Sequence, residues 1–123
     1  MISAKALRSW CLARPGVTEE LPFGPVTTVF KVEGKLFCLS ALDRSPLEIS
    51  LKCEPGLAEA LRRDHPAIRP GYHLNKRHWN TVLCDGSLPD QMVIDMLEDS
   101  YDLVVEGLPR RTRERLGWSV GDG

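Results

Sequence analysis

The 123-residue chain lacks the features that mark several large classes of protein. No stretch approaches the roughly 20 consecutive apolar residues of a membrane-spanning helix, and no apolar N-terminal run follows a basic segment as in a secretory signal. Its four cysteines form no C-x-x-C pair, and each lies among apolar or strand-like neighbours, which is typical of buried free thiols. We therefore expect a soluble, cytoplasmic protein with no membrane partner.

The chain also lacks a strong charge of either sign. Its 16 Lys and Arg residues and 17 Asp and Glu residues leave a formal net charge of -1, whereas proteins that bind nucleic-acid backbones usually carry a clear excess of cations. The charges are nevertheless unevenly distributed, because residues 62–78 hold five cations and one acid while residues 85–106 hold seven acids and no cation. This asymmetry predicts a molecule with one basic and one acidic side.

Motifs for catalysis, cofactor binding and metal binding are missing as well. No serine or cysteine lies in a nucleophile elbow, and no glycine-rich loop is present to cradle a phosphate. His73 and His78 are five residues apart, which places them on different faces of a helix or strand, and with Cys84 and Asp85 they match no coordination motif. The acids of residues 95–102 are simply explained as a solvated helix face. We expect no enzymatic activity, no cofactor and no metal.

The chain does contain periodic segments separated by turn signals. Residues 3–14 predict a helix capped by Ser3, and the Pro- and Gly-containing residues 17–25 predict an ordered loop whose Phe23 is anchored in the core. Residues 26–53 alternate between apolar and polar side chains, as three antiparallel strands do, with Glu33-Gly34 as a two-residue hairpin turn. The first half of the chain is therefore expected to be a helix followed by a three-stranded meander.

The second half continues with a helix, a strand and a longer helix. Pro55 begins a helix over residues 55–64, and residues 79–83 form a strand. Residues 87–107 predict a helix whose apolar face covers the sheet, made of Val93, Leu97, Tyr101, Val104 and Leu108. We expect an α+β domain of two layers over residues 1–109, followed by a basic C-terminal tail over residues 110–123.

Recognition chemistry is densest in residues 70–80, which contain two histidines, two cations, two aromatic residues and two amides. Lys76 and Arg77 have the charge to meet phosphates, Asn75 can orient a base edge, and Tyr72 or His73 can stack on an unpaired base. Neighbouring strand residues point to opposite faces, so both cations can meet one duplex only near the tip of a hairpin. The alternative is an architectural role, with packed aromatics, bonded histidines and solvated cations.

Several segments of the chain resemble the MmcQ/YjbR family. The most specific is Gly71-Tyr72-His73-Leu74-Asn75-Lys76-Arg77-His78-Trp79, which matches the family's Gly-Tyr-His-x-Asn-(Lys/Arg)-(Lys/Arg)-His-Trp in full. Further matches are Pro22-Phe23-Gly24 and residues 29–32, 51–53 and 100–104, so the similarity covers most of the chain. The resemblance implies an α-β3-α-β2-α two-layer sandwich with an antiparallel sheet, like that of bacterial secretion chaperones, and a second strand in residues 68–76. It also implies DNA binding through a double-wing arrangement of hairpins, without catalytic activity or a cofactor.

We therefore expect a basic hairpin surface that binds DNA. Its candidate residues are Tyr72, His73, Asn75, Lys76, Arg77, His78, Arg62, Arg63, Arg69, Arg110, Arg111 and Arg113. The last three reinforce the surface only if the basic C-terminal segment folds back beside Lys76 and Arg77. The alternative is a chaperone-like interaction module that takes a protein partner, or a second copy of the chain in a homodimer, along a sheet edge or groove.

Overall fold

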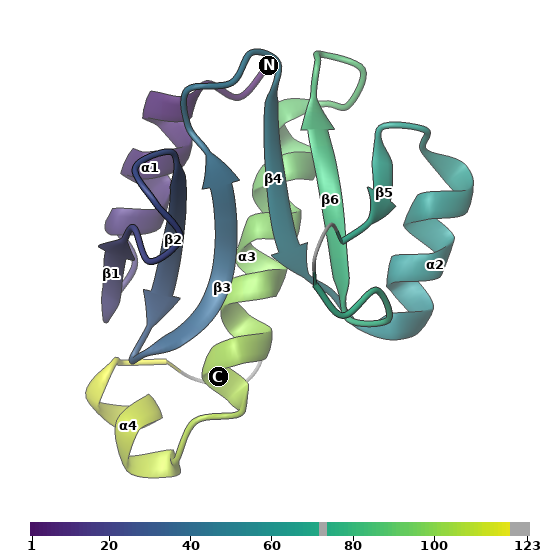
Figure 1. The fold of residues 1–123 in the computed structure, drawn as a ribbon. Coiled ribbons are helices and arrows are strands. Elements are labelled where there is room, and N and C mark those ends of the chain that lie inside the picture. The colour runs from purple at the N-terminus through teal and green to yellow at the C-terminus, as the bar shows by residue number, and fades with distance from the viewer. Residues whose placement is uncertain (72–73, 119–123) are drawn as a thin grey trace.

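The computed structural model describes residues 1–71 and 74–118, which form one antiparallel sheet of six strands and four helices (Figure 1). The strands lie side by side in the order β1-β2-β3-β4-β6-β5. The predicted α+β class with an antiparallel sheet is confirmed. In chain order the elements are α1 (Ala4–Leu12), β1 (Val17–Glu20), β2 (Thr27–Val32), β3 (Lys35–Ala41), β4 (Leu47–Lys52), α2 (Pro55–Asp64), β5 (Ile68–Pro70), β6 (Trp79–Cys84), α3 (Asp90–Glu106) and α4 (Arg110–Arg115).

Local signals set the start of α1 and the β2–β3 turn as the sequence predicts. The Ser3 hydroxyl accepts a hydrogen bond from the Ala6 N–H at 3.1 Å, which caps the first turn of α1. Glu33 and Gly34 have φ angles of 49° and 80°, so both adopt the left-handed conformation that a two-residue hairpin turn requires. The start of α1 and the turn between β2 and β3 are therefore determined by residues that are neighbours in the sequence.

The long helix α3 covers one face of the sheet. Ser100 is fully buried; its hydroxyl donates to the Phe37 carbonyl at 2.5 Å and accepts from the Lys52 N–H at 2.9 Å, which joins α3 to β3 and β4. In Figure 1, α1 and α3 lie behind the sheet, and no described helix covers the front of β3 and β4. The predicted apolar face is buried at every position: Val93, Leu97, Tyr101 and Val104 lie in α3, and Leu108 lies just beyond its end.

Residues 17–25 differ from the ordered loop that the sequence predicts. Val17–Glu20 form the edge strand β1, in which Val17 lies opposite Val32 of β2. Three of its four residues are polar, so the side chains do not signal a strand, and the pairing uses backbone groups that any residue supplies. The expected core anchor, Phe23, is instead 72% exposed.

Residues 110–118 differ from the expected basic tail. Arg110–Arg115 form α4, and Arg115 makes an ion pair with Glu33 in the β2–β3 turn. The Trp118 indole N–H donates to an Asp102 carboxylate oxygen at 3.0 Å, and Leu116 also packs against the core. These contacts hold residues 110–118 against the domain. Residues 119–123 of the expected tail lie outside the described residues.

The four cysteines are free and buried, as the sequence predicts. Across residues 1–71 and 74–118, none of the helices is long and apolar enough to cross a membrane.

Candidate nucleic-acid interface

The basic segment lies in the loop of the β5–β6 hairpin. Ile68 and Pro70 of β5 lie opposite Val82 and Asn80 of β6, and the loop between the strands comprises residues 71–78. Lys76 and Arg77 lie in a turn just before β6 and are exposed. The hairpin geometry that the sequence argument requires, with both cations near the tip, agrees with this structure.

Gly71 allows the two strands to approach closely at the base of the loop. Its N–H donates to the Trp79 carbonyl at 2.9 Å. A Cβ atom at position 71 would lie only 2.7 Å from the Trp79 Cβ, which is closer than real Cβ contacts, and a tight 3.1 Å from the Trp79 carbonyl oxygen. The glycine of the family signature is therefore required by backbone proximity.

Asn75 holds the turn in shape. Its side-chain oxygen accepts from the Arg77 N–H at 2.9 Å, and its carbonyl accepts from the His78 N–H at 3.2 Å, as in an Asx-turn. The His78 carbonyl accepts from the Cys53 N–H at 2.7 Å, which ties the loop to the end of β4. Asn75 thus has a structural role in the free protein, where the sequence analysis expected it to orient a base.

Three cations converge at the hairpin tip, and we call Arg62, Lys76 and Arg77 the tip cluster. The Arg62 guanidinium reaches from α2 and donates to the Lys76 carbonyl at 2.6 Å. The Lys76 ammonium donates to the Gly71 carbonyl at 3.1 Å, which leaves two of its three donor positions for another acceptor. Among the described residues, the Arg77 guanidinium has no hydrogen-bond or ion-pair partner.

Two further arginines of this region have acidic partners. Arg63 pairs with its neighbour Asp64 at 3.4 Å, and Arg69 pairs with Glu48 of β4. The Arg63 pair is exposed and contributes little, so Arg63 stays available to a phosphate. Arg69 lies opposite Thr81, and its pairing with Glu48 places its guanidinium on the uncovered face of the sheet. The region is therefore basic without being free of acids.

The arginines of α4 do not fold back beside Lys76 and Arg77. Figure 1 shows α4 next to the β2–β3 turn, whereas the β5–β6 loop lies near the opposite edge of the sheet. The docking of Trp118 and Arg115 explains this position. The two hairpin turns nevertheless lie at the same end of the sheet, and their axes are three strand spacings apart, or about 14 Å. Of the three candidates there, Arg110 pairs with Glu114 at 3.0 Å, and Arg111 and Arg113 share the helix.

Two candidates, Tyr72 and His73, lie outside the described residues, so their positions relative to the tip cluster are not part of the structure. His78 is half-buried at the end of the turn.

The groups considered for catalysis have structural roles. The Ser50 hydroxyl shares a 3.0 Å hydrogen bond with the Thr81 hydroxyl, and Ser100 bridges α3 to the sheet. Burial raises the pKa of the Cys84 thiol to about 11, and burial together with a hydrogen bond to Cys11 raises the pKa of Cys38. Such thiols are protonated at neutral pH and are poor nucleophiles.

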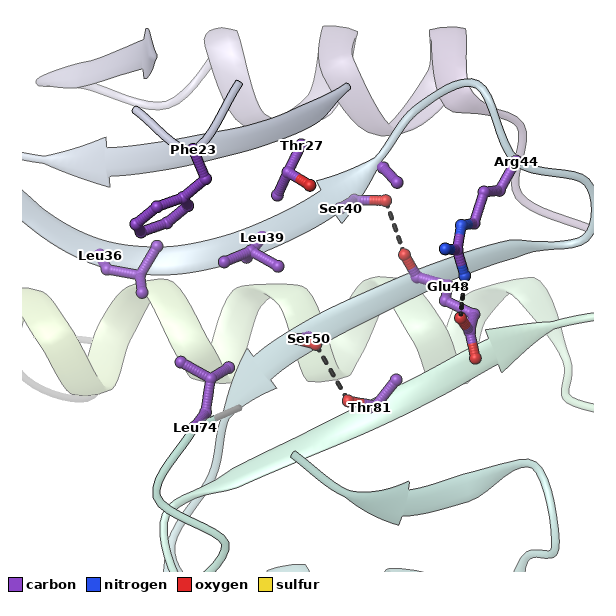
Figure 2. Close-up of a pocket in the computed structure, with 11 residues that line it drawn as sticks. Phe23, Thr27, Leu36, Leu39, Ser40, Arg44, Glu48, Ser50, Leu74 and Thr81 are labelled. Atoms are coloured by element: carbon purple, nitrogen blue, oxygen red, sulfur yellow. Dashed lines mark hydrogen bonds and ion pairs between the residues drawn. The ribbon is translucent and has the colours of Figure 1, made fainter. Parts of the chain in front are cut away.

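A cavity lies on the uncovered sheet face; a groove was one alternative from the sequence, but its place and its lining residues were not predicted. Its volume is about 430 Å³; its floor comes from β3, β4 and β6, and Phe23 and Leu74 flank it from two loops (Figure 2). The sequence feature that belongs to this cavity is Phe23 in a Pro- and Gly-containing loop, and Phe23 was predicted to lie in the core. Because the lining residues come from separate segments, sequence spacing does not reveal the cavity.

Comparisons with known proteins agree with the fold. The sequence model of the YjbR family matches residues 12–103 of this chain. The chain is 40% identical over 110 residues to Escherichia coli K12 protein YjbR, covering 89% of this chain and 93% of that protein. It is also 40% identical over 95 residues to YbdF of E. coli O157:H7, covering 77% and 78% of the two chains.

A solved structure gives the same result. The crystal structure of Deinococcus radiodurans protein DR2400 superposes with a TM-score of 0.90 at 40% identity, covering 97% of this chain and 91% of that chain. The E. coli relatives are themselves uncharacterised, so the comparisons establish ancestry and fold but no activity. The chain belongs to the YjbR family.

Proposed function

We propose that this protein is a non-catalytic DNA-binding protein that contacts backbone phosphates through the tip cluster. The observation that supports the proposal is the β5–β6 turn, which presents Lys76 and Arg77 to solvent beside Arg62. The hydrogen bonds of Asn75 and Arg62 order this turn in the free protein, so less conformational freedom is lost when phosphate binds.

The proposed contact is a double wing on a two-layer framework. In this arrangement the sheet forms one layer, α1 and α3 form the other, and the β2–β3 and β5–β6 turns face the duplex together. Their separation of about 14 Å is within the span of one duplex. The second wing is weaker, because Glu33 and Glu114 neutralise part of the α4 charge. The tip cluster is therefore the principal contact.

The chemistry of the tip favours binding with little dependence on base sequence. Arginine and lysine that meet phosphates position a protein on DNA but do not read bases. Asn75, the amide nearest to these cations, is already engaged in the turn. The proposal also implies a cytoplasmic location, for which the four free thiols are the support.

The salt dependence of binding tests the proposal. If three phosphates are neutralised, log K falls with log salt at a slope of about -2.7, so affinity drops about 40-fold between 50 and 200 mM salt. The double variant Lys76→Ala/Arg77→Ala retains one such contact and should lose only about 3.5-fold over the same range, besides binding more weakly. Fluorescence anisotropy with a short labelled duplex measures both values.

A matched variant controls for the loss of two charges. Lys5→Ala/Arg44→Ala removes two exposed cations from outside the hairpin tip, Arg44 from the turn at the opposite end of the sheet, and should keep the native slope. Equal slopes for the two double variants would contradict the assignment of the tip cluster. The absence of measurable binding to duplex or single strand near about 50 mM salt would refute DNA binding altogether.

The second candidate function is a protein-interaction module, and the sheet edges do not favour it. The edge strand β5 has three residues and ends in Pro70, and β1 has four residues, of which Glu19 and Glu20 pair with Arg8 and Lys31. Short, charged or proline-containing edges resist the addition of another strand. If a partner or second copy nevertheless binds there, sedimentation velocity should show a complex whose stability changes little with salt.

A further inference from the structure

The cavity on the uncovered sheet face has a chemical polarity along its length. Figure 2 shows Phe23, Leu36 and Leu74 at one end and Arg44 with Glu48 at the other. Along β3, the lining runs from Leu36 to Ala41, which corresponds to about 16 Å. The volume of about 430 Å³ is within the range of small-molecule sites.

The apolar side chains at one end of the cavity are left open to solvent within a single chain. Phe23 is 72% exposed, and its loop holds it over the sheet face. Leu36 and Leu39 of the floor, together with Leu74 on the opposite wall, are only half-buried. An apolar group placed between the two walls would cover these side chains.

The charged end has an excess of one positive charge. Glu48 is shared between two guanidinium groups, because one carboxylate oxygen pairs with Arg69 and the other lies 3.4 Å from Arg44. Arg44 therefore has the weaker contact, and its side chain is 65% exposed. A carboxylate that enters the cavity can make a bidentate pair with Arg44, whereas a cation would meet two arginines and an already paired glutamate.

The hydroxyl groups of the floor do not require a polar ligand. Ser50 pairs with Thr81, and the Ser40 hydroxyl donates to the Glu48 carbonyl at 2.6 Å. β3 pairs with β2 along its length and β4 pairs with β6, whereas β3 and β4 pair with each other only at Cys38–Leu51 and Leu39–Ser50. A peptide lying on this floor would therefore find few backbone partners, and its remaining buried N–H and C=O groups would be costly.

We propose that this cavity binds a small amphipathic carboxylate, with its apolar body between Phe23 and Leu74 and its carboxylate on Arg44. The site is independent of the proposed DNA contact, because none of the tip cluster lines it. Leu74 nevertheless belongs to the same loop as Lys76 and Arg77. Occupancy should therefore perturb the backbone signals of this loop as well as those of β3 and β4.

The test is an NMR titration of the full chain with decanoate, with decylamine as the probe of opposite charge. Decanoate should bind saturably and shift the amide signals of Leu39, Ser50 and Thr81, while decylamine should bind at least about tenfold more weakly. Arg44→Gln and Phe23→Ala should each weaken decanoate binding about tenfold, because one removes the charged partner and the other removes an apolar wall.

Matched variants separate this site from general surface binding. Leu21→Ala removes an exposed apolar side chain from the same loop as Phe23, and Arg111→Gln removes an exposed cation from α4. Neither residue lines the cavity. Both variants should therefore bind decanoate as the native chain does.

Three results would overturn the proposal. They are the absence of saturable binding tighter than about 1 mM, equal binding of decanoate and decylamine, and affinity that is unchanged in both Arg44→Gln and Phe23→Ala. A dimer that forms without ligand and dissociates in Phe23→Ala would likewise overturn it, since the face would then be an interface between copies.

Discussion

Replacing Gly71 by alanine tests whether the β5–β6 hairpin depends on the close approach of its strands. The added Cβ would lie 2.7 Å from the Trp79 Cβ and 3.1 Å from the Trp79 carbonyl oxygen. Neither atom is the end of a flexible side chain, so the strands must separate and the 2.9 Å hydrogen bond from the Gly71 N–H must lengthen. Overpacking of this kind costs about 2 kcal/mol, which lowers Tm by about 8 °C for a chain of this size.

Gly107→Ala is the matched control. Gly107 has a φ of -82°, and a Cβ there would meet only the Val104 carbonyl oxygen at an ordinary 3.6 Å. Urea and thermal unfolding followed by circular dichroism should therefore show native-like stability for this variant. If Gly71→Ala were as stable as Gly107→Ala, the close approach of Gly71 and Trp79 would be refuted, and with it the geometry that positions Lys76 and Arg77.

Three other predictions concern the framework. Ser100→Ala should destabilise the fold by about 2 kcal/mol, because the half-buried Lys52 N–H and the buried Phe37 carbonyl lose their partner; in urea melts Ser9→Ala, at an exposed position of α1, is its control. Trp118→Phe should cost about 1 kcal/mol through loss of the hydrogen bond to Asp102, and an unchanged urea midpoint would contradict the docking of residues 116–118. Hydrogen bonds from the Gly56 and Leu57 N–H groups lower the pKa of Glu54 below its ordinary 4.5. A carboxyl with a lowered pKa stabilises the fold above its unfolded pKa and ceases to do so as pH falls through the folded pKa. Glu54→Gln should therefore lose less stability than the native chain when pH is lowered below about 4.5; equal acid losses would contradict this role.

Elements with strong local chemistry were predictable from the sequence. The Ser3 cap, the Glu33-Gly34 turn and the apolar face of α3 depend on residues that are close in sequence, so spacing and residue type are sufficient to locate them. The hairpin position of Lys76 and Arg77 was a condition of the DNA-binding hypothesis, and the second strand that forms the hairpin was implied only by the family resemblance.

Features that depend on long-range contacts were not predictable. β1 is formed by backbone pairing with β2, and its polar side chains conceal it. Phe23 was assigned to the core because aromatic residues usually pack there, yet it flanks a cavity whose other wall, Leu74, is 51 residues away in sequence. The contact between Arg62 and the Lys76 carbonyl and the docking of α4 through Trp118 likewise join separate segments.

The most direct test of DNA binding by the tip cluster is a residue-resolved NMR titration of the native chain with a short duplex at low salt. We expect the largest amide shifts at residues 62–63 and 74–78, smaller shifts in α4, and reversal of all of them as salt is raised. Largest shifts on the acidic helix α3 or on the sheet face around Phe23, or no shifts at all, would contradict the account.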